Sequence, residues 1–410
     1  MRVKQVLLPL LLILILVMFN RVFLNTFSRA NQYFSSQTLN TTEILHPQRL
    51  FERTWKIIYK DYYDPSLNHQ EWGRWKSHYH NKIKTDEDAK VAIDTMIASL
   101  NEPYTRFMNE KEFQDLTTSI TSKIFGIGVN IYSNSGKIEV FNVIPSTPAD
   151  FAGIKQGDVI IAVDGKDTNG MNVSEVATLV RGPENSVVEI TLLRNNKKLL
   201  KKIKRKEIKI KNVKSSIIDN HIAYIQIISF MGGTTPIEFL DALESTKNTD
   251  SIIIDLRGNT GGLLDNAVFI ANLFIPQGEI VEIIYRNGHK KSISANPQQK
   301  PLDKPVVVLV NGASASASEI LSGALKDYKK AKLVGKKTFG KGLVQKVVPL
   351  PNNTGVNITV ARYLTPNGTD INKLGIKPDI EIGNEFDFYL NNSKKDLQLE
   401  AAKEILNAKN

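Results

Sequence analysis

The sequence contains no cysteine and few histidines. The missing cysteine excludes disulfide bonds, thiolate zinc sites and a cysteine nucleophile. The six histidines are His46, His69, His78, His80, His221 and His289. None of them lies between residues 306 and 345 or in any later segment. A serine nucleophile in that region is therefore not expected to use histidine, its usual proton acceptor.

Basic residues are in excess, but only locally. Lysine and arginine number 53 against 42 acidic residues, a net charge of +11. Residues 194–214 hold eleven basic side chains and only Glu207, so this stretch alone nets +10. The excess is therefore one patch, and no nucleic-acid partner is expected. Apolar residues alternate with lysine over residues 208–214, which predicts a strand with a lysine-rich solvent face; attraction to anionic lipid or wall polymer is the alternative.

A long apolar run occurs near the N-terminus. Arg2 and Lys4 precede fourteen consecutive apolar or neutral residues, 6–19, and apolar residues continue to Leu24. Such a run is typical of a cleaved signal sequence or a membrane anchor, and we favour an uncleaved single-pass anchor over residues 1–25. In both cases the basic end stays in the cytoplasm and the rest is exported. We therefore expect a cell-membrane protein whose catalytic part is extracytoplasmic.

Residues 26–113 are assigned to a small helical N-terminal domain. Thr85 and Asp88 can cap a helix whose apolar residues recur at helical spacing and which ends before Asn101. Aromatic residues cluster around another short helix near Trp55. We interpret both apolar stripes as intramolecular core.

The segment Ser314-Ala315-Ser316-Ala317-Ser318-Glu319 follows the apolar run Val306–Val310 and leads into a helical pattern. A serine at such a strand-to-helix junction is exposed, and amides of the first helical turn can stabilise an oxyanion beside it, as acyl transfer requires. Lys341 is the candidate base, because an apolar surrounding lowers the pKa of a lysine. The residues expected to provide that surrounding are Phe339, Leu343 and Val344. The alternative is that neither segment is catalytic. In that case the small residues around Ser316 mark a helix start that packs tightly against a sheet, and Gly-Lys-Gly is a solvated turn.

Two segments, Ser314–Glu319 and Phe339-Gly340-Lys341-Gly342, resemble motifs of the C-terminal processing peptidases, also called tail-specific proteases. A third matching segment is Asp255-Leu256-Arg257-Gly258-Asn259-Thr260-Gly261-Gly262. The resemblance implies a serine peptidase with Ser316 as nucleophile, Lys341 as general base and Gln345 as the residue that orients Lys341. It further implies an oxyanion hole made by the backbone amides of Ala317 and of Gly262 or Gly261, and no need for a metal or organic cofactor. We interpret Asp255, Arg257 and Asn259 as structural.

From about residue 117 to residue 205 the pattern changes to short strands separated by turns, and the motifs resemble a PDZ domain. The resemblance implies that this domain binds a peptide's C-terminal carboxylate with backbone amides of a glycine-rich turn, and that the peptide adds as an extra strand. The implied binding residues are Gly126, Ile127, Gly128, Val129 and Arg181. The side chains of Ile127 and Val129 would line the pocket for the last peptide residue, and Arg181 would relay binding to the active site.

The sequence therefore predicts a multidomain α+β protein. Its expected parts are an anchor (1–25), a helical domain (26–113), a PDZ domain (114–206), a mixed α/β, crotonase-like peptidase core (207–390) and a C-terminal helix (391–410). The expected function is a membrane-anchored serine endopeptidase that recognises protein or peptide substrates by their exposed C-termini. In the resembled family the helical region also helps dimerisation. The alternatives are a catalytically silent PDZ scaffold and a crotonase-like enzyme acting on thioesters; retention of both Ser316 and Lys341 favours the peptidase.

Overall fold

The computed structural model describes residues 45–121, 124–208, 211–297, 301–383 and 396–408. The predicted anchor over residues 1–25 lies outside this part of the chain. Within the described ranges, every helix is too short or too polar to cross a membrane. The chain divides into two compact units, one built from residues 45–114, 285–287 and 344–361 and the other from the remaining described residues.

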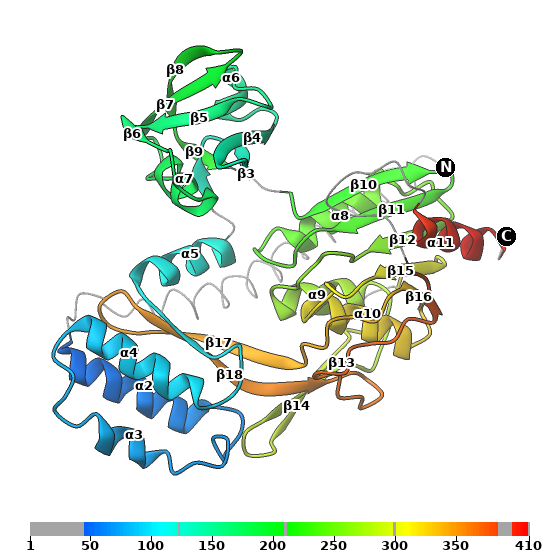
Figure 1. Cartoon of the computed structure of the whole chain (residues 1–410). Helices are drawn as coiled ribbons and strands as arrows, with labels where there is room; N and C mark the ends of the chain where they lie inside the picture. The colour runs from blue at the N-terminus through cyan, green and yellow to red at the C-terminus, as the bar shows by residue number, and fades with distance from the viewer. Residues whose placement is uncertain (1–44, 122–123, 209–210, 298–300, 384–395, 409–410) are drawn as a thin grey trace, which may run out of the picture. The chain divides into compact units, whose positions relative to one another are not determined.

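The first unit is a helical layer completed by strand segments from late in the chain. Its elements are α2 (Pro47–Asp61), α3 (Gly73–His78), α4 (Asp86–Ala98), β1 (Arg106–Met108) and parts of β17 (Leu343–Pro349) and β18 (Gly355–Leu364). The predicted cap of α4 is confirmed, since Thr85 Oγ1 accepts from Asp88 N at 3.1 Å and Asp88 Oδ2 accepts from Thr85 N at 2.9 Å. Helices α2, α3 and α4 lie together in Figure 1.

The core of this unit contains residues from outside the helical domain predicted over residues 26–113. Phe51, Ile58 and Ile93 are buried together with Val356 and Ile358 of β18. The apolar faces of α2 and α4 thus need a cover that residues 26–113 do not supply. This cover comes from β18, which also pairs antiparallel with β1.

The predicted PDZ segment forms an antiparallel sheet with its own core. The sheet order is β3-β4-β5-β7-β8, with β6 paired to β5. The elements are β3 (Val129–Asn134), β4 (Lys137–Val143), α6 (Pro148–Phe151), β5 (Val159–Val163), β6 (Lys166–Asp167), α7 (Val173–Val180), β7 (Val187–Arg194) and β8 (Lys197–Lys204). Its core contains Val140, Ile160 and Val188. Helix α5 (Glu110–Thr121) and strand β2 (Ile124–Gly126) come before this sheet in the chain, and β9 (Lys206–Ile208) comes after it. Strands β2 and β9 pair with each other in antiparallel orientation.

The predicted lysine-rich strand through residues 208–214 is wrong. Strand β9 ends at Ile208 and β10 (Val213–Ile218) begins at Val213, so Ile208 and Val213 belong to two different strands, and residues 209–210 lie outside the described part of the chain. Much of the basic patch instead lies on β8, whose lysines are mostly exposed because one face of the β7–β8 hairpin is solvated.

The predicted mixed α/β core is confirmed as a six-stranded sheet. Its order is β10-β11-β12-β15-β16-β19, antiparallel between β10 and β11 and parallel thereafter. The elements not yet given are β11 (Ile222–Ile227), α8 (Thr235–Ser245), β12 (Ser251–Asp255), α9 (Leu264–Asn272), β15 (Val306–Val310), α10 (Ala317–Asp327), β16 (Ala331–Gly335), β19 (Ile380–Glu381) and α11 (Leu397–Asn407). A separate hairpin is formed by β13 (Glu279–Tyr285) and β14 (Lys290–Ser294).

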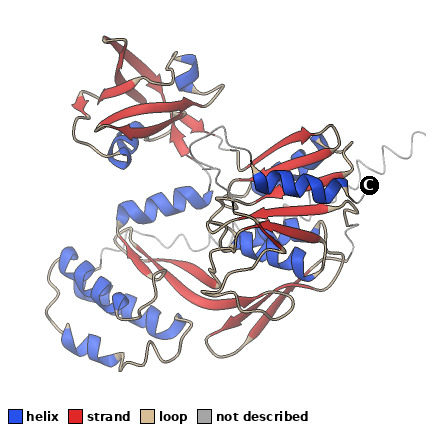
Figure 2. Cartoon of the chain, turned by 45° about the vertical axis from the view of Figure 1, so that its right-hand side comes forward, coloured by secondary structure: helices blue, strands red, loops and turns tan. Residues whose placement is uncertain are grey.

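Helices lie on both sides of this sheet, as Figure 2 shows. Ile253, Val307 and Leu309 pack with Ala402 and Leu406 of α11. Successive side chains of a strand point to opposite faces, so Ile252 and Ile254 of β12 and the side chains of residues 306, 308 and 310 of β15 face away from α11. Both strands are buried along their whole length, as expected for parallel strands covered on two faces.

Candidate active site

The predicted strand-to-helix junction holds Ser316 in an unusual backbone conformation. Strand β15 ends at Val310 and α10 begins at Ala317, directly after Ser316. Ser316 has φ 56° and ψ −115°, a region that residues with a β-carbon rarely adopt. Such strain costs on the order of 1–3 kcal/mol and persists only where the surroundings enforce it, as at active sites.

The three serines of this segment are not equivalent. Ser314 and Ser318 are fully buried, and their hydroxyls donate to Leu256 O at 2.8 Å and to Asn259 O at 2.9 Å. Ser316 is half-buried, and its hydroxyl donates to no residue of the described chain. Ser316 is therefore the serine whose oxygen is available for chemistry.

A buried carboxylate joins the segment of Ser316 to that of Lys341. Glu319 has no exposed surface. Its Oε2 accepts from Ser316 N at 2.9 Å and from Lys341 N at 2.8 Å. Its Oε1 accepts from Thr338 Oγ1 at 2.6 Å and Gly340 N at 2.7 Å. Four donors therefore converge on one side chain, and the backbones of the candidate nucleophile and base are held to the same group.

A phenol provides a second link between the two segments. The hydroxyl of Tyr363 lies 2.6 Å from Lys341 O and 3.2 Å from Ser316 O. Neither Glu319 nor Tyr363 is among the catalytic residues predicted from the sequence. Glu319 had a visible signal, since it is an acid in the first turn of a helix directly after the candidate serine. Tyr363 lies 22 residues beyond Lys341 and had no local signal.

The surroundings of Lys341 differ in part from the prediction. Leu343 is buried and Val344 half-buried, but Phe339 is 56% exposed. Phe339 N donates to Ser314 O, which fixes its backbone while its side chain points into solvent. More than half of the Phe339 side chain faces solvent, so its part in shielding Lys341 stays a prediction.

The glycines beside Lys341 allow another loop to approach closely. A β-carbon on Gly340 would lie 2.9 Å from Gly375 N, and one on Gly342 would lie 2.7 Å from Asn372 N. Gly340 also has φ 90°. The presence of glycine on both sides of the lysine thus has a steric cause.

The diglycine loop lies against the candidate nucleophile. A β-carbon on Gly261 would lie 2.9 Å from Ser316 Cβ and 3.0 Å from Ala317 N. The amide of Gly261 is already used, since it donates to Asn259 Oδ1 at 2.8 Å. The amides of Gly262 and Ala317 donate no hydrogen bond within the described part of the chain. Of the two glycines that the sequence left open, the geometry favours Gly262 as the partner of Ala317.

The residues before the diglycine hold the loop in place, in agreement with their interpretation as structural. Asn259 Nδ2 donates to Ile227 O at 2.8 Å, and its carbonyl accepts from Ala315 N at 3.1 Å. Asp255 and Arg257 are buried and form an ion pair of 2.7 Å between Oδ2 and Nη2. These contacts tie the loop to two neighbouring strands and to the serine segment.

Gln345 lies in β17 and belongs to the first unit, whereas Lys341 belongs to the second. Its side-chain amide donates to Thr359 Oγ1 at 3.4 Å. The orientation of Lys341 by Gln345 stays a prediction.

The glycine-rich turn of the PDZ segment is fixed by the start of α6. Gly128 has φ 90°, and a β-carbon there would lie 2.3 Å from Thr147 Oγ1. Ile127 O accepts from Ala149 N at 2.8 Å. The side chain of Ile127 is 1% exposed and packs in the domain core instead of lining an open pocket, which differs from the prediction. Gly126 is buried at the end of β2.

The strand that follows this turn has an open edge. Val129 is half-buried at the start of β3, and β3 is the outermost strand of its sheet in the described chain. An exposed edge next to a turn of backbone amides is the arrangement that β-strand addition of a peptide requires. Arg181 is exposed and caps the C-terminal end of α7.

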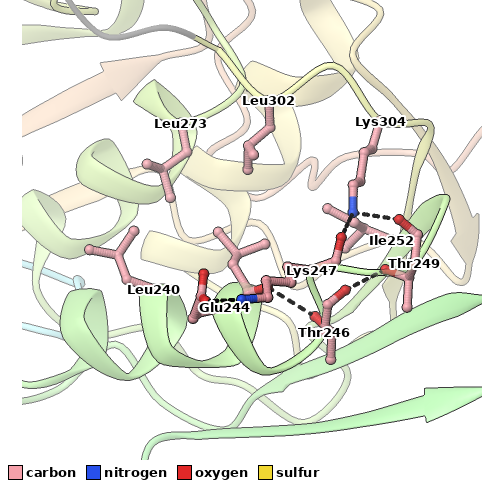
Figure 3. Close-up of a pocket in the computed structure, with 10 residues that line it drawn as sticks. Leu240, Glu244, Thr246, Lys247, Thr249, Ile252, Leu273, Leu302 and Lys304 are labelled. Carbon is pink, nitrogen blue, oxygen red and sulfur yellow. Dashed lines mark hydrogen bonds and ion pairs between the residues drawn. The ribbon is translucent and has the colours of Figure 1, made fainter. Parts of the chain in front are cut away.

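A cavity of about 400 Å³ lies elsewhere in the second unit, between α8, the start of β12 and the segment before β15. Leu240, Leu273 and Leu302 form part of its wall, and Lys304 Nζ donates to the carbonyls of Lys247 and Thr249 (Figure 3). None of the predicted catalytic residues lines this cavity. Across the described residues there is no group of three or more histidine, aspartate or glutamate side chains arranged to hold a metal ion.

Two family models match this chain. The model of peptidase family S41 matches residues 221–382, and that of the PDZ domain matches residues 139–194.

Several named proteins are similar over most of their length. A carboxyl-terminal-processing protease of Synechocystis is 35% identical over 371 residues, which cover 88% of this chain and 86% of that protein. The carboxy-terminal processing protease CtpA of Bacillus subtilis is 40% identical over 312 residues, covering 75% and 66%. Among solved structures, a photosystem II D1 C-terminal processing protease matches with a TM-score of 0.57 and 32% identity, covering 83% of this chain and 94% of that one.

Proposed function

Since this chain belongs to the carboxyl-terminal-processing proteases of peptidase family S41, and is therefore a serine peptidase with a PDZ domain, we propose that it cleaves with a Ser316–Lys341 pair. The observation that carries this proposal is the Glu319 carboxylate, which binds the backbone amides of both residues. A carboxylate that holds the amides of Ser316 and Lys341, which are 25 residues apart in sequence, is the kind of preorganisation that a nucleophile and its base require.

The proposed reaction begins with neutral Lys341. Its amine takes the hydroxyl proton of Ser316 as the serine oxygen attacks the carbonyl carbon of the scissile peptide bond. The amides of Gly262 and Ala317 donate to the oxyanion of the tetrahedral intermediate. The intermediate collapses when the C–N bond breaks and the lysine ammonium gives its proton to the leaving amine. An ester between Ser316 and the N-terminal part of the substrate remains.

The second half of the reaction restores the enzyme. Lys341 is neutral again and takes a proton from water, which attacks the ester carbonyl. The second tetrahedral intermediate releases the serine oxygen, which regains a proton from the lysine ammonium, and the product leaves as a carboxylic acid. All steps use groups that the chain itself supplies.

The PDZ domain is proposed to hold the substrate by its tail. The turn at Gly128 presents backbone amides to the terminal carboxylate, and the peptide adds along the open edge of β3. Support comes from the fixed geometry of this turn and from the outermost position of β3. Arg181, at the end of α7, is the proposed relay from the bound tail to the peptidase core.

The location is proposed from the N-terminal sequence alone. Residues 6–19 follow two basic residues, which supports an anchor with the catalytic part outside the cytoplasm. Membrane fractionation combined with protease added to intact cells tests this. Recovery of the full-length chain in the soluble fraction of the cytoplasm would contradict it.

Catalysis is tested with the full-length chain and a peptide that ends in apolar residues. Ser316→Ala and Lys341→Ala are expected to abolish cleavage, whereas Lys337→Ala, which changes an exposed lysine nearby, should cleave like the parent. Mass spectrometry should find an acyl adduct on Ser316 when an ester substrate is used. Cleavage by both active-site variants would refute the mechanism. Tail binding without cleavage by the parent chain would favour the alternative, a silent PDZ scaffold.

A further inference from the structure

The C-terminal helix makes a buried polar contact with the motif that precedes the diglycine. Arg257 is 4% exposed, and its guanidinium has two sets of partners. Nε and Nη2 donate to the Asp255 carboxylate, the latter at 2.7 Å. Nη1 donates to Asp396 Oδ1 at 2.9 Å and to Gln398 Oε1 at 3.2 Å. Arg257 therefore joins the end of β12 to the start of α11, about 140 residues later in the chain.

The partners of Arg257 on α11 are themselves fixed. Asp396 is the N-cap of α11, and its Oδ1 also accepts from Leu399 N at 3.1 Å. Gln398 is 1% exposed, and its Nε2 donates to Ile382 O at 2.9 Å. Ala402 and Leu406, further along the helix, pack in the core against the sheet. The position of these two polar side chains is thus set by the docking of α11.

A continuous set of bonds leads from Arg257 to the oxyanion loop. Asp255 Oδ1 accepts from Arg257 N at 2.9 Å, which fixes the turn after β12. Asn259 N donates to Leu256 O at 3.1 Å, and its side-chain oxygen accepts from Gly261 N at 2.8 Å. Gly262 follows directly. Residues 255–259 and Gly261 are therefore hydrogen-bonded within this turn or to neighbouring segments.

We propose that α11 positions the oxyanion hole, with Asp396 and Gln398 as positioning residues that hold Arg257 and, through it, the amide of Gly262. This inference rests on the proposed function, because it assigns a role to that amide in catalysis. Asp396 and Gln398 touch no reacting atom. Their effect is on the orientation of a hydrogen-bond donor, which must lie about 2.7–3.1 Å from the developing oxyanion and within about 0.5 Å of its ideal position to be effective.

The role differs from general support of the fold in one respect. Removing Asp396 leaves the Asp255–Arg257 ion pair intact, so no buried charge loses its opposite partner. The apolar contacts of α11 also remain. Asp396→Ala also removes the cap on Leu399 N, so part of the cost falls on the first turn of α11; the rest falls on the orientation of the guanidinium and of the turn attached to it.

The test compares Asp396→Ala and Gln398→Ala with Lys403→Ala in the full-length chain. Lys403 lies on the same helix but pairs with Asp219 at 3.0 Å, away from Arg257. Each positioning variant should lower kcat by about tenfold or more without changing KM for the tail peptide, as expected for a misplaced donor. Lys403→Ala should leave kcat within about twofold. Asp396→Asn, which keeps one acceptor, should recover part of the loss and serves if the alanine variant does not fold.

A second measurement does not depend on activity. Hydrogen exchange by mass spectrometry, in a Ser316→Ala background, should show faster exchange over residues 257–263 in Asp396→Ala than in Lys403→Ala. Unchanged exchange in that segment, or an equal loss of kcat in Lys403→Ala, would overturn the inference. If the parent chain does not cleave while the exchange difference is present, the proposed function fails and the mechanical link stands.

Discussion

Glu319 offers the sharpest test of how the site is held together. Its carboxylate accepts four hydrogen bonds in a fully buried position. Glutamine keeps the shape but has one acceptor and one donor group. If the NH2 group of the glutamine took the Oε2 position, it would face the amides of both Ser316 and Lys341, which are also donors. If it took the Oε1 position, it would face Gly340 N and the Thr338 hydroxyl, and the hydroxyl can turn and accept from it. The amide group of Glu319→Gln should therefore occupy the Oε1 position.

The expected magnitude follows from the donors left without a partner. In that orientation one buried amide, Gly340 N, loses its acceptor, at a cost of about 1–3 kcal/mol. Alanine at position 319 would strand three backbone amides, about 3–9 kcal/mol by the same reasoning, which approaches the stability of a whole domain, about 5–15 kcal/mol. Glutamine is therefore the informative change. Gly340 precedes Lys341, and a shift of about 1 Å at a catalytic group can lower a rate by about 10²-fold.

The assay measures kcat, KM and urea denaturation for Glu319→Gln. We expect kcat to fall about 10²-fold, with KM for the tail peptide unchanged because the PDZ turn is untouched. Glu238→Gln is the matched control, since Glu238 Oε2 accepts from Asn212 N and Val213 N at 2.6 and 3.0 Å in another part of the core. It should keep kcat and most of its stability, because the carbonyl oxygen of the glutamine can take the Oε2 position and accept both bonds. The reasoning is refuted if Glu319→Gln retains kcat within about twofold, or if the control loses as much.

Three further outcomes are expected. Gly262→Ala should cost at least about 1–3 kcal/mol in urea denaturation and abolish cleavage, because Gly262 has φ 146° and a β-carbon would lie 2.3 Å from Phe230 C; near-parental stability would contradict this. Gly128→Ala should weaken binding of a labelled tail peptide in fluorescence anisotropy, because the β-carbon would meet Thr147; unchanged affinity would show that this turn does not hold the tail. A hydrogen bond to α11 raises the pKa of His221, so its stabilising contribution is complete below about pH 6.5 and lost as pH rises through the folded pKa. Exchange protection at that end of α11 should decline as pH rises above about 6.5 in the parent and stay constant in His221→Gln.

The parts of the fold that could be predicted from the sequence are those determined by residues close to one another in the chain. Residues Val306–Val310 form an uninterrupted β-branched and leucine run, and such a run is compatible with a strand buried on both faces. Thr85 and Asp88 satisfy each other's amides within one helical turn, so the start of α4 is also fixed locally. The candidate nucleophile could be found for the same reason, because a strand run followed by small residues and a helical pattern is contiguous in sequence.

The features that the sequence did not predict depend on segments far apart in the chain. The first-turn position of Glu319 indicates only its bond to Ser316 N. Its bonds to residues 338–341 arise because the loop after β16 returns to the start of α10, and this return is a property of the tertiary fold. The cover that β18 gives to α2 and α4 is of the same kind, since nothing in residues 26–113 shows that their core is incomplete.

The backbone of Ser316 explains why so many long-range contacts converge on one residue. A positive φ at a serine costs on the order of 1–3 kcal/mol and would relax if its neighbours allowed it. Glu319 accepts from the amide of Ser316, and the Tyr363 hydroxyl lies beside the Ser316 carbonyl. Gly261 packs so closely against the β-carbon of Ser316 that a side chain at position 261 would not fit. Each of these contacts comes from a different element, so relaxation in any one direction is opposed. The strained conformation is thereby kept ready before substrate arrives, and the cost of forming it is met during folding and not during catalysis.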